Sequence, residues 1–323
     1  MLYPKITKTA KALPKKRVTN HDLAQFLETS DEWITQRTGI KERRISVTES
    51  VASLSVEVAK KLSQDIDVTT IDLIIVATMS ADYSTPSVAC VVQESVGAVN
   101  AMCFDVNAAC SGFVYALSIA EKYLSHPSYQ TALVIGTDVM SHLVDWSDRQ
   151  TAVLFGDGSG GVLIEKTSSQ QSFLAESIHS DGKRHQALFG HVIARDNRFR
   201  QIGDTHPFLV MNGKQIFDFA MRDVSKNMLE LLLSHSIATE DIDYVLAHQA
   251  NFRILEALAK KTNISSDKFL SNVDRFGNTS AASIPLLLDD AVKTGVIPLS
   301  GESLCMLTGY GAGLTWGSLL IKL

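Results

Sequence analysis

Short, uninterrupted apolar runs recur along the chain and predict strands that are covered on both faces. A strand with one solvated face would alternate apolar and polar residues, and these runs do not alternate. Stretches with the 3.6-residue period of helices separate them. The pattern therefore favours an α/β fold. The expected strands are Leu73–Ala77, Met102–Val106, Ala132–Ile135, Gly161–Ile164, Tyr244–Ala247 and Ser303–Leu307.

The clearest helical period follows Cys110. Phe113, Leu117, Ala120 and Leu124 fall at i, i+4, i+7 and i+11, which is one face of a helix. We expect a helix to begin just after Cys110 and to bury that face.

The same order of elements occurs twice along the chain. Each copy has an apolar strand, a helical segment, a sharp polar loop that opens a helix, a further strand and a Gly-rich turn before a last strand. We predict two related α/β halves, residues 1–170 and 171–323, joined near residues 165–175. The matching segments are Ile71–Ala77 with Ile242–Ala247, Asn107–Gly112 with Phe276–Ser280, and Gly156–Ile164 with Gly311–Ile321.

Composition narrows the class of protein. The 323 residues carry a net charge of −5, so no basic excess indicates nucleic acid. The chain has no apolar stretch of membrane-spanning length, and its first residues form no apolar signal segment. Its four cysteines show no CxxC spacing, which argues against a zinc site or a disulfide framework. We expect a cytoplasmic protein without a metal, a membrane or a nucleic-acid partner.

Cys110 is the first candidate for chemistry. Polar loops at the carboxyl ends of strands carry the sites of doubly wound sheets. A cysteine at such a strand-to-helix turn lies near the positive end of a helix, which favours the thiolate. The alternative is a buried cysteine that acts as a small apolar residue.

His248 and Asn278 are the candidate partners of Cys110. His248 directly follows the expected strand Tyr244–Ala247, and Asn278 stands on the loop that matches the loop of Cys110. All three should converge where the halves meet. The alternatives are a satisfied core histidine and an asparagine that caps a helix.

Two neutral donors, a histidine N–H and an asparagine N–H₂, suit one particular reaction. They could stabilise the enolate that forms when a carboxylate leaves as carbon dioxide. The turn Gly311-Ala312-Gly313 could add a backbone N–H to that of Cys110 and form an oxyanion hole. A plain hairpin turn is the alternative there. A papain-like hydrolase also uses Cys, His and Asn, but its cysteine lies near the mature N-terminus.

Several motifs, in order and spacing from about residue 3 onward, resemble the β-ketoacyl-[acyl-carrier-protein] synthase III family. The His–Asn pair separates this resemblance from the elongating synthases, which use two histidines, and from thiolases, which use a second cysteine. The motifs are Asp31–Ile34, Arg37–Ile40, Ala108–Phe113, Phe155–Gly158, His248–Asn251, Gly277–Pro285 and Leu314–Gly317.

The resemblance implies a thiolase-like fold of five αβαβα layers and a homodimer. It also implies that a short acyl-CoA, acetyl-CoA first, acylates Cys110. Malonyl on the acyl carrier protein would then lose carbon dioxide and attack the acyl group, with His248 and Asn278 holding its thioester oxygen. No cofactor is expected, because acyl-CoA is a substrate.

Binding residues follow from the resemblance by position. Trp33 and Arg149 would sandwich the adenine of CoA, and an aromatic ring beside basic residues fits a nucleotide face. The implied contacts of CoA are Trp33, Arg37, Arg149, Gly213 and Asn251, and those of the acyl chain are Phe217 and Thr85.

The acidic carrier protein would bind at Gln249 and at a basic stripe formed by Arg253, Lys260 and Lys261. The stripe residues fall at i, i+7 and i+8 on one expected helix. A solvated helix face is the alternative, and a docking face would lose its steering at high salt.

The chain departs from the family pattern at two places. Ala312 replaces a glycine, which would cost about 1–2 kcal/mol if the turn needs a positive φ. Thr85-Pro86 replaces a bulkier apolar residue, so the pocket for the primer is expected to differ in shape.

Two further hypotheses stay open. One is a related synthase of polyketide or other secondary metabolism. A 3-hydroxy-3-methylglutaryl-CoA synthase would need a carboxylic acid in the loop before Cys110, where only Asp82 stands. The other is a binding module without catalysis, which predicts the loss of a catalytic residue, and none is lost.

Overall fold

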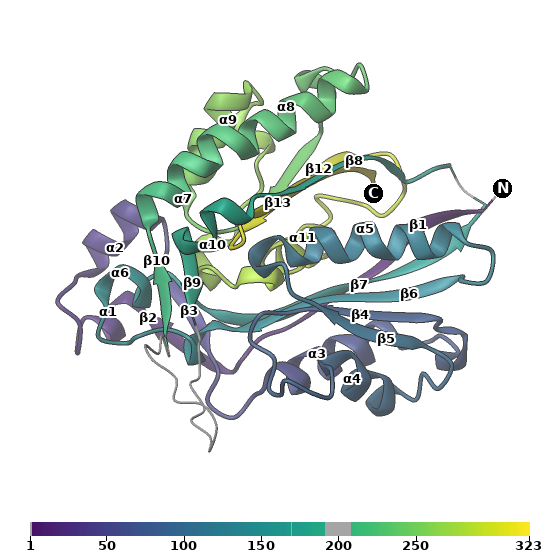
Figure 1. The fold of residues 1–323 in the computed structure, drawn as a ribbon, viewed down its shortest axis with the longest axis horizontal. Coiled ribbons are helices and arrows are strands. Elements are labelled where there is room, and N and C mark those ends of the chain that lie inside the picture. Colours follow the sequence, from purple (N-terminus) through teal and green to yellow (C-terminus); the bar gives the residue numbers. More distant parts are fainter. Residues whose placement is uncertain (1, 169, 191–207) are drawn as a thin grey trace.

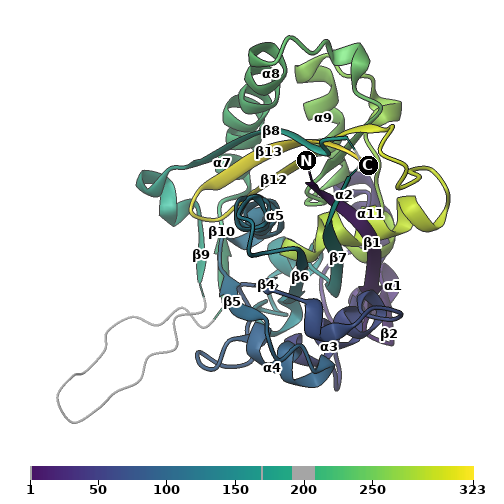
Figure 2. The same ribbon diagram turned by 90° about the vertical axis from the view of Figure 1, so that its right-hand side faces the viewer.

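The computed structural model describes residues 2–168, 170–190 and 208–323. Five layers alternate between helices and sheets, as Figure 1 shows from α8 and α9 at the top to α3 and α4 at the bottom. The outer helices are α8 (Ser225–Ser234), α9 (Phe252–Thr262), α3 (Val51–Leu62) and α4 (Val88–Val96). The central layer holds α5 (Gly112–Ser125) and α11 (Ser283–Lys293), and Figure 2 looks along α5 between the two sheets.

The two sheets have the same topology. The first runs β1-β7-β6-β4-β5 and the second β8-β13-β12-β11. Each contains a parallel pair (β4 with β6, β11 with β12) followed by two antiparallel pairs, and in the first sheet β5 adds a second parallel pair beside β4. The strands are β1 (Tyr3–Ala12), β4 (Leu73–Ala77), β5 (Met102–Val106), β6 (Thr131–Val139), β7 (Asp157–Thr167), β8 (Phe173–Ser180), β11 (Tyr244–Ala247), β12 (Leu304–Gly311) and β13 (Thr315–Lys322).

Where the first sheet has β5, the second has only one parallel bridge between Phe269 and Val245. The repeat of elements expected from the sequence is therefore present in the topology, with one strand reduced to a bridge. The strands of the first sheet come from residues 3–167 and those of the second from residues 173–322. The division at residue 170 stays a prediction.

Three of the expected strands have the bounds that the apolar runs gave, and the others are longer. The last begins at Leu304 and continues to Gly311, beyond the predicted end at Leu307. The polar and small residues after Leu307 hid this extension. The expected helix is α5, and the four residues of its predicted face are all 0% exposed.

Shorter elements complete the chain and surround one end of the layers. They are β2 (Lys16–Thr19), α1 (Asn20–Leu23), α2 (Asp31–Thr38), β3 (Glu42–Ile45), α6 (Arg149–Ala152), β9 (Leu188–Gly190), β10 (Leu209–Met211), α7 (Gly213–Phe219) and α10 (Val273–Phe276). A π-helical turn, Ala220–Val224, joins α7 to α8.

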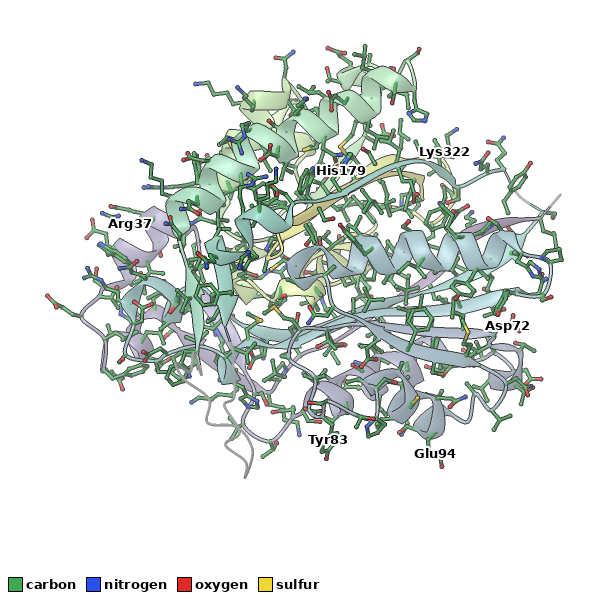
Figure 3. All side chains as sticks on the ribbon, viewed as in Figure 1. Arg37, Asp72, Tyr83, Glu94, His179 and Lys322 are labelled. Atoms are coloured by element: carbon green, nitrogen blue, oxygen red, sulfur yellow. The ribbon has the colours of Figure 1, made fainter. Side chains whose placement is uncertain are left out.

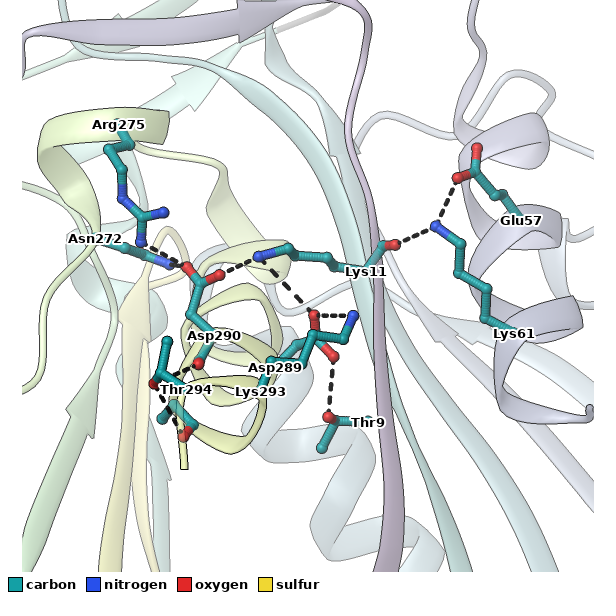
Figure 4. Close-up of polar contacts among 11 residues, drawn as sticks. Thr9, Lys11, Glu57, Lys61, Asn272, Arg275, Asp289, Asp290, Lys293 and Thr294 are labelled. Atoms are coloured by element: carbon teal, nitrogen blue, oxygen red, sulfur yellow. Dashed lines mark hydrogen bonds and ion pairs between the residues drawn. The ribbon is translucent and has the colours of Figure 1, made fainter. Parts of the chain in front are cut away.

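An ion network ties α11 to the first strand (Figure 4). Lys11 of β1 pairs with Asp290 of α11, and the same carboxylate accepts from Arg275 at 2.8 Å and from Asn272 at 2.9 Å. The neighbouring Asp289 accepts from Thr9 of β1 at 3.0 Å. These contacts fix the helix whose N-terminal end follows the loop of Asn278.

Candidate active site

One cavity brings together the three residues expected to carry the chemistry. Cys110, His248 and Asn278 all line it, and its volume of about 440 Å³ is within the usual range of small-molecule sites. The three side chains are 5%, 2% and 7% exposed, so they form its inner wall. The apolar part of the wall comprises Met79, Met140, Leu154, Phe155, Leu188, Leu209, Met211, Ile216, Phe217, Ile254 and Tyr310.

A tight turn presents Cys110 to the cavity. Asn107 accepts the N–H of Ala109 at 3.3 Å, and Ala109 has a left-handed φ of 46°. A 3₁₀ turn over Ala109–Ser111 then leads into α5. Gly311 lies against Cys110, because a Cβ there would be 2.9 Å from the Cβ of Cys110. Only glycine fits this close approach of β12.

The protonation state of Cys110 differs from the expectation. Burial raises the pKa of its thiol to about 12, and the nearby carboxylate of Asp138 acts in the same direction. A helix N-terminus contributes roughly 0.3–1 kcal/mol, which is too little to offset a shift of that size. Burial therefore favours the thiol of Cys110, against the thiolate that the helix terminus alone predicts.

His248 leaves the end of β11 and is held on three sides. Its backbone N–H donates to Thr308 at 2.8 Å, and its Nδ1 lies 2.7 Å from the hydroxyl of Ser283. The ring of Tyr310 packs edge-on at 5.1 Å, and its hydroxyl donates to the carbonyl of His248 at 3.3 Å. Burial lowers the pKa of His248 to about 3, so the imidazole is neutral at neutral pH.

Asn278 is fixed through its backbone and its side-chain oxygen. Its N–H donates to Leu154 at 2.8 Å, and its carbonyl accepts from Gly156 at 3.0 Å. Its Oδ1 accepts the N–H of Ser280 at 2.9 Å. This contact assigns the oxygen, so the N–H₂ group is the part of the amide that faces the cavity. The helix cap considered as an alternative is not its role, because no helix begins at Asn278.

Sequence reasoning missed Asp138, a fully buried carboxylate behind the site. It accepts from the backbone N–H groups of Met79, Ser80 and Ala281 at 2.9, 3.1 and 3.1 Å. Burial raises its pKa. Asp138 thus joins the loop after β4 to the segment that follows Asn278. Its place near the carboxyl end of β6 was a signal that could have found it.

The residues expected to bind CoA gather on the outer side of the cavity. Arg37, Gly213 and Asn251 line it. Trp33 lies outside the lining, with the guanidinium groups of Arg37 and Arg149 over its ring at 4.8 and 4.9 Å. The group is continuous, because Arg37 belongs to both the lining and the contacts of Trp33.

Two predicted residues lie away from this cavity. Thr85 is in an exposed loop and does not line it. In Figure 3, Tyr83 of the same loop lies at the lower edge of the molecule, away from Arg37 at the left. Ala312 lines a neighbouring pocket instead, and it is not among the described residues with a positive φ. The replacement of glycine by Ala312 therefore carries no left-handed strain.

The residues expected to meet a carrier protein fall into two groups. Arg253 lines the cavity and is exposed, and Lys260 and Lys261 are exposed in the last turn of α9. Gln249 is 0% exposed, since its amide donates to Ala247 and accepts from Ser271. The expected direct contact of Gln249 with a partner is corrected, because its side chain holds the loop after β11 from within.

In the part of the chain that the structure describes, no three His, Cys, Asp or Glu side chains are grouped to hold a metal ion. No helix among these residues combines the length and the apolar character needed to cross a membrane.

The chain is similar to known proteins over its whole length. It is 51% identical over 325 residues to the β-ketoacyl-[acyl-carrier-protein] synthase III of Streptococcus uberis, with 100% of both chains covered. Among solved structures, the 3-oxoacyl-[acyl-carrier-protein] synthase III of Aquifex aeolicus is 38% identical with a TM-score of 0.92, covering 99% of this chain and 100% of the other. The priming β-ketosynthase of the R1128 polyketide pathway is 30% identical with a TM-score of 0.90, covering 99% and 96%.

The layers and the Cys–His–Asn cavity, together with these relatives, define an acyl-transferring condensing enzyme with a thiolase-like fold. Two family models match the chain: 3-oxoacyl-[acyl-carrier-protein (ACP)] synthase III over residues 104–182, and the C-terminal model of the same name over residues 232–323. The chain belongs to the 3-oxoacyl-[acyl-carrier-protein] synthase III family.

Proposed function

We propose that the enzyme condenses a short acyl-CoA, acetyl-CoA first, with malonyl on the acyl carrier protein. The products are 3-oxoacyl-carrier protein, CoA and carbon dioxide, and the reaction initiates fatty-acid synthesis. The observation that carries this proposal is the shared cavity of one thiol nucleophile and two neutral donors, Cys110, His248 and Asn278.

In the first half of the reaction, the sulfur of Cys110 attacks the thioester carbonyl of the primer. The bond between the acyl carbon and the CoA sulfur breaks, and the proton of the Cys110 thiol is transferred to the sulfur of the departing CoA. The transfer is neutral in charge, which suits a thiol whose pKa burial raises to about 12. The N–H of Cys110 and that of Ala312 are the proposed oxyanion donors.

In the second half, the malonyl carboxylate leaves as carbon dioxide and its electron pair forms an enolate. The N–H₂ of Asn278 and an N–H of His248 would bind the thioester oxygen that becomes negative. A neutral imidazole is suited to this role, because it donates without first giving up a proton. The enolate carbon then attacks the acyl group on Cys110 and releases the sulfur, which takes a proton from water.

The substrates and partners follow from the surroundings of the cavity. We propose CoA at Trp33, Arg37 and Arg149, the acyl chain beside Phe217, and the acidic carrier at the basic stripe. No cofactor takes part in these steps, and acyl-CoA acts as a substrate. The proposed site of action is the cytoplasm.

We also propose that the enzyme is a homodimer. The edge strand β5 has an open side (Figure 2), and its residues Met102–Val106 are all partly or fully exposed. The unpaired backbone N–H and C=O groups of such an edge strand can form hydrogen bonds with a strand of another chain. Thr85 lies in the exposed loop before α4. If a second copy packs against this edge, Thr85 of one copy could contact the acyl chain bound in the other, as the resemblance predicts.

A priming synthase of polyketide metabolism is the second candidate, since one such enzyme has the same fold. The chain is 51% identical to the β-ketoacyl-[acyl-carrier-protein] synthase III of Streptococcus uberis but only 30% identical to that priming β-ketosynthase, and this difference favours initiation of fatty-acid synthesis.

The test is product formation from malonyl-carrier protein and a panel of acyl-CoA primers, for the wild type and Cys110→Ala. We expect the wild type to release carbon dioxide and form 3-oxoacyl-carrier protein. Cys110→Ala should decarboxylate malonyl without condensing it. If the wild type makes no 3-oxoacyl product with any primer, the proposed function is wrong.

A further inference from the structure

We infer that Ser283 is a positioning residue that sets the tautomer of His248, so that the proton of the ring sits on Nε2 and faces the cavity. The role of this tautomer in catalysis rests on the proposed function, in which His248 donates a hydrogen bond to the thioester oxygen. The assignment of the ring proton to Nε2 does not depend on the reaction.

The contact between Ser283 and His248 is short and shielded from solvent. The hydroxyl of Ser283 and the Nδ1 of His248 are 2.7 Å apart, and the two residues are 1% and 2% exposed. Water therefore cannot replace either partner. Because Nδ1 is engaged on this side, Nε2 is the ring nitrogen left for the cavity that His248 lines.

The direction of the hydrogen bond follows from what else is within reach. Among the described residues, Nδ1 of His248 is the partner found for the hydroxyl of Ser283, and no second acceptor is found. If Nδ1 carried the proton, the hydroxyl hydrogen would be buried without an acceptor, at a cost of roughly 1–3 kcal/mol. The hydroxyl therefore donates to Nδ1, and Nε2 keeps the proton.

The position of Ser283 on α11 holds its hydroxyl in place against His248. It is the first residue of α11, five positions after Asn278. The far end of α11 is clamped to β1 by Asp289 and Asp290. One segment thus supplies the amide donor and also fixes which nitrogen of the imidazole donates. For histidines that bind a metal, removing the partner of the second ring nitrogen typically costs 10–100-fold in affinity or activity, and we expect an effect of that order here.

The first test is a direct measurement on the wild type. In enzyme labelled with ¹⁵N-histidine, the His248 signals are assigned by their loss in His248→Gln. We expect the chemical shifts of a protonated Nε2 and an unprotonated Nδ1. A protonated Nδ1 in the wild type would overturn the inference, and this readout needs no Ser283 variant to fold.

The second test separates the two half-reactions in Ser283→Ala. We expect malonyl decarboxylation to fall about tenfold or more, while the burst of CoA released by acylation of Cys110 stays within about twofold. The ¹⁵N signals should shift toward a mixture of tautomers. Unchanged decarboxylation together with an unchanged tautomer would contradict the role of Ser283.

The matched control is Ser55→Ala. Ser55 is also buried on a helix, and its hydroxyl bonds to Val51 and Thr137, none of which lines the cavity. It should lose stability without changing either half-reaction. If the wild type shows a protonated Nε2 but does not decarboxylate malonyl-carrier protein, the proposed function fails and the assignment of the tautomer stands.

Discussion

Asn107 and Asn278 make the same local contact at matching places in the two halves. The Oδ1 of each accepts the N–H two residues ahead, at 3.3 and 2.9 Å. The acceptor turn places Ala109 and Ser280 at left-handed φ values of 46° and 52°. A 3₁₀ turn and a helix follow in both halves. The repeated loop has thus diverged in chemistry: one copy supplies a thiol three residues after its asparagine, and the other supplies the amide itself.

This relationship provides a matched pair of variants. Asn278→Asp keeps the oxygen that accepts from Ser280 but replaces the N–H₂ that faces the cavity. Removing one such donor typically costs about 10²–10³ in rate. We expect malonyl decarboxylation to fall by that factor while acylation of Cys110 changes little. Asn107→Asp keeps the same turn and should leave decarboxylation near the wild-type rate. Equal losses in both variants would contradict the donor role of Asn278.

The buried imidazole should make the enzyme sensitive to acid. The pKa of His248 is lowered by burial to about 3, whereas an unfolded histidine titrates near 6.5. Below a pH of about 6.5, His248 binds a proton in the unfolded state but not in the folded state. The free energy of unfolding therefore falls as the pH drops toward 3. His248→Gln should flatten this part of the curve, measured by urea unfolding at several pH values. An unchanged slope in the variant would argue that His248 is protonated in the folded protein.

Asp290 should also lose its contribution to stability in acid, but at lower pH and for a different reason. Burial alone would raise its pKa, but the hydrogen bonds from Lys11 and Asn272 and the charge of Arg275 hold the pKa below its usual range. Its contribution to stability is therefore present above the unfolded pKa of about 3.9 and is lost as the pH falls through the folded value. We expect Asp290→Asn to lower the free energy of unfolding by roughly 1–3 kcal/mol at pH 7, with the difference vanishing in acid.

An exposed ion pair on the other side of the same network is the control for Asp290. Glu57 and Lys61 of α3 form a pair with side chains that are 54% and 47% exposed. Glu57→Gln should change the free energy of unfolding by less than about 1 kcal/mol. A loss as large as that of Asp290→Asn would mean that burial does not set the strength of these contacts.

Met79 is expected to limit the length of the primer. It lines both the catalytic cavity and the neighbouring pocket that contains Ala312, so its side chain stands between them. Met79→Ala should join the two spaces and raise kcat/KM for octanoyl-CoA relative to acetyl-CoA by roughly tenfold or more. Met79→Leu keeps the bulk and should keep the preference. An unchanged ratio in Met79→Ala would show that the primer does not extend toward this pocket.

The basic stripe can be tested by reversing charge. Lys260 and Lys261 are exposed on α9, and their joint replacement by Glu should raise the KM for malonyl-carrier protein several-fold at low salt. The effect should shrink at high salt, because the attraction between exposed charges is screened. The same reversal at Lys15 and Lys16, which are also exposed, changes the net charge equally and should leave KM unaltered. Equal effects of both double variants would indicate a general response to net charge.

The sequence predicted the features that local pattern determines. Uninterrupted apolar runs marked the strands, and the polar residues at their ends pointed to Cys110, His248 and Asn278. It could not predict the thiol state of Cys110, since that depends on how deeply the fold buries it. Nor could it predict the donor to His248, because Ser283 reaches the ring only after α11 packs beneath β11. Gln249 was misjudged for the same reason, since a polar residue after a strand can turn inward.

The close approach of Gly311 to Cys110 has a consequence for synthesis on the ribosome. Cys110 lies in the first half of the chain, but the wall beside it belongs to β12, which pairs along its length with β13. A nascent chain that ends before β13 can form the first sheet and still lack the enclosed cavity. Its cysteine would then be more open to water and oxidants than the mature thiol is. The enclosed cavity can therefore form only after β12 and β13 have been synthesised, and until then Cys110 lacks the wall that buries it.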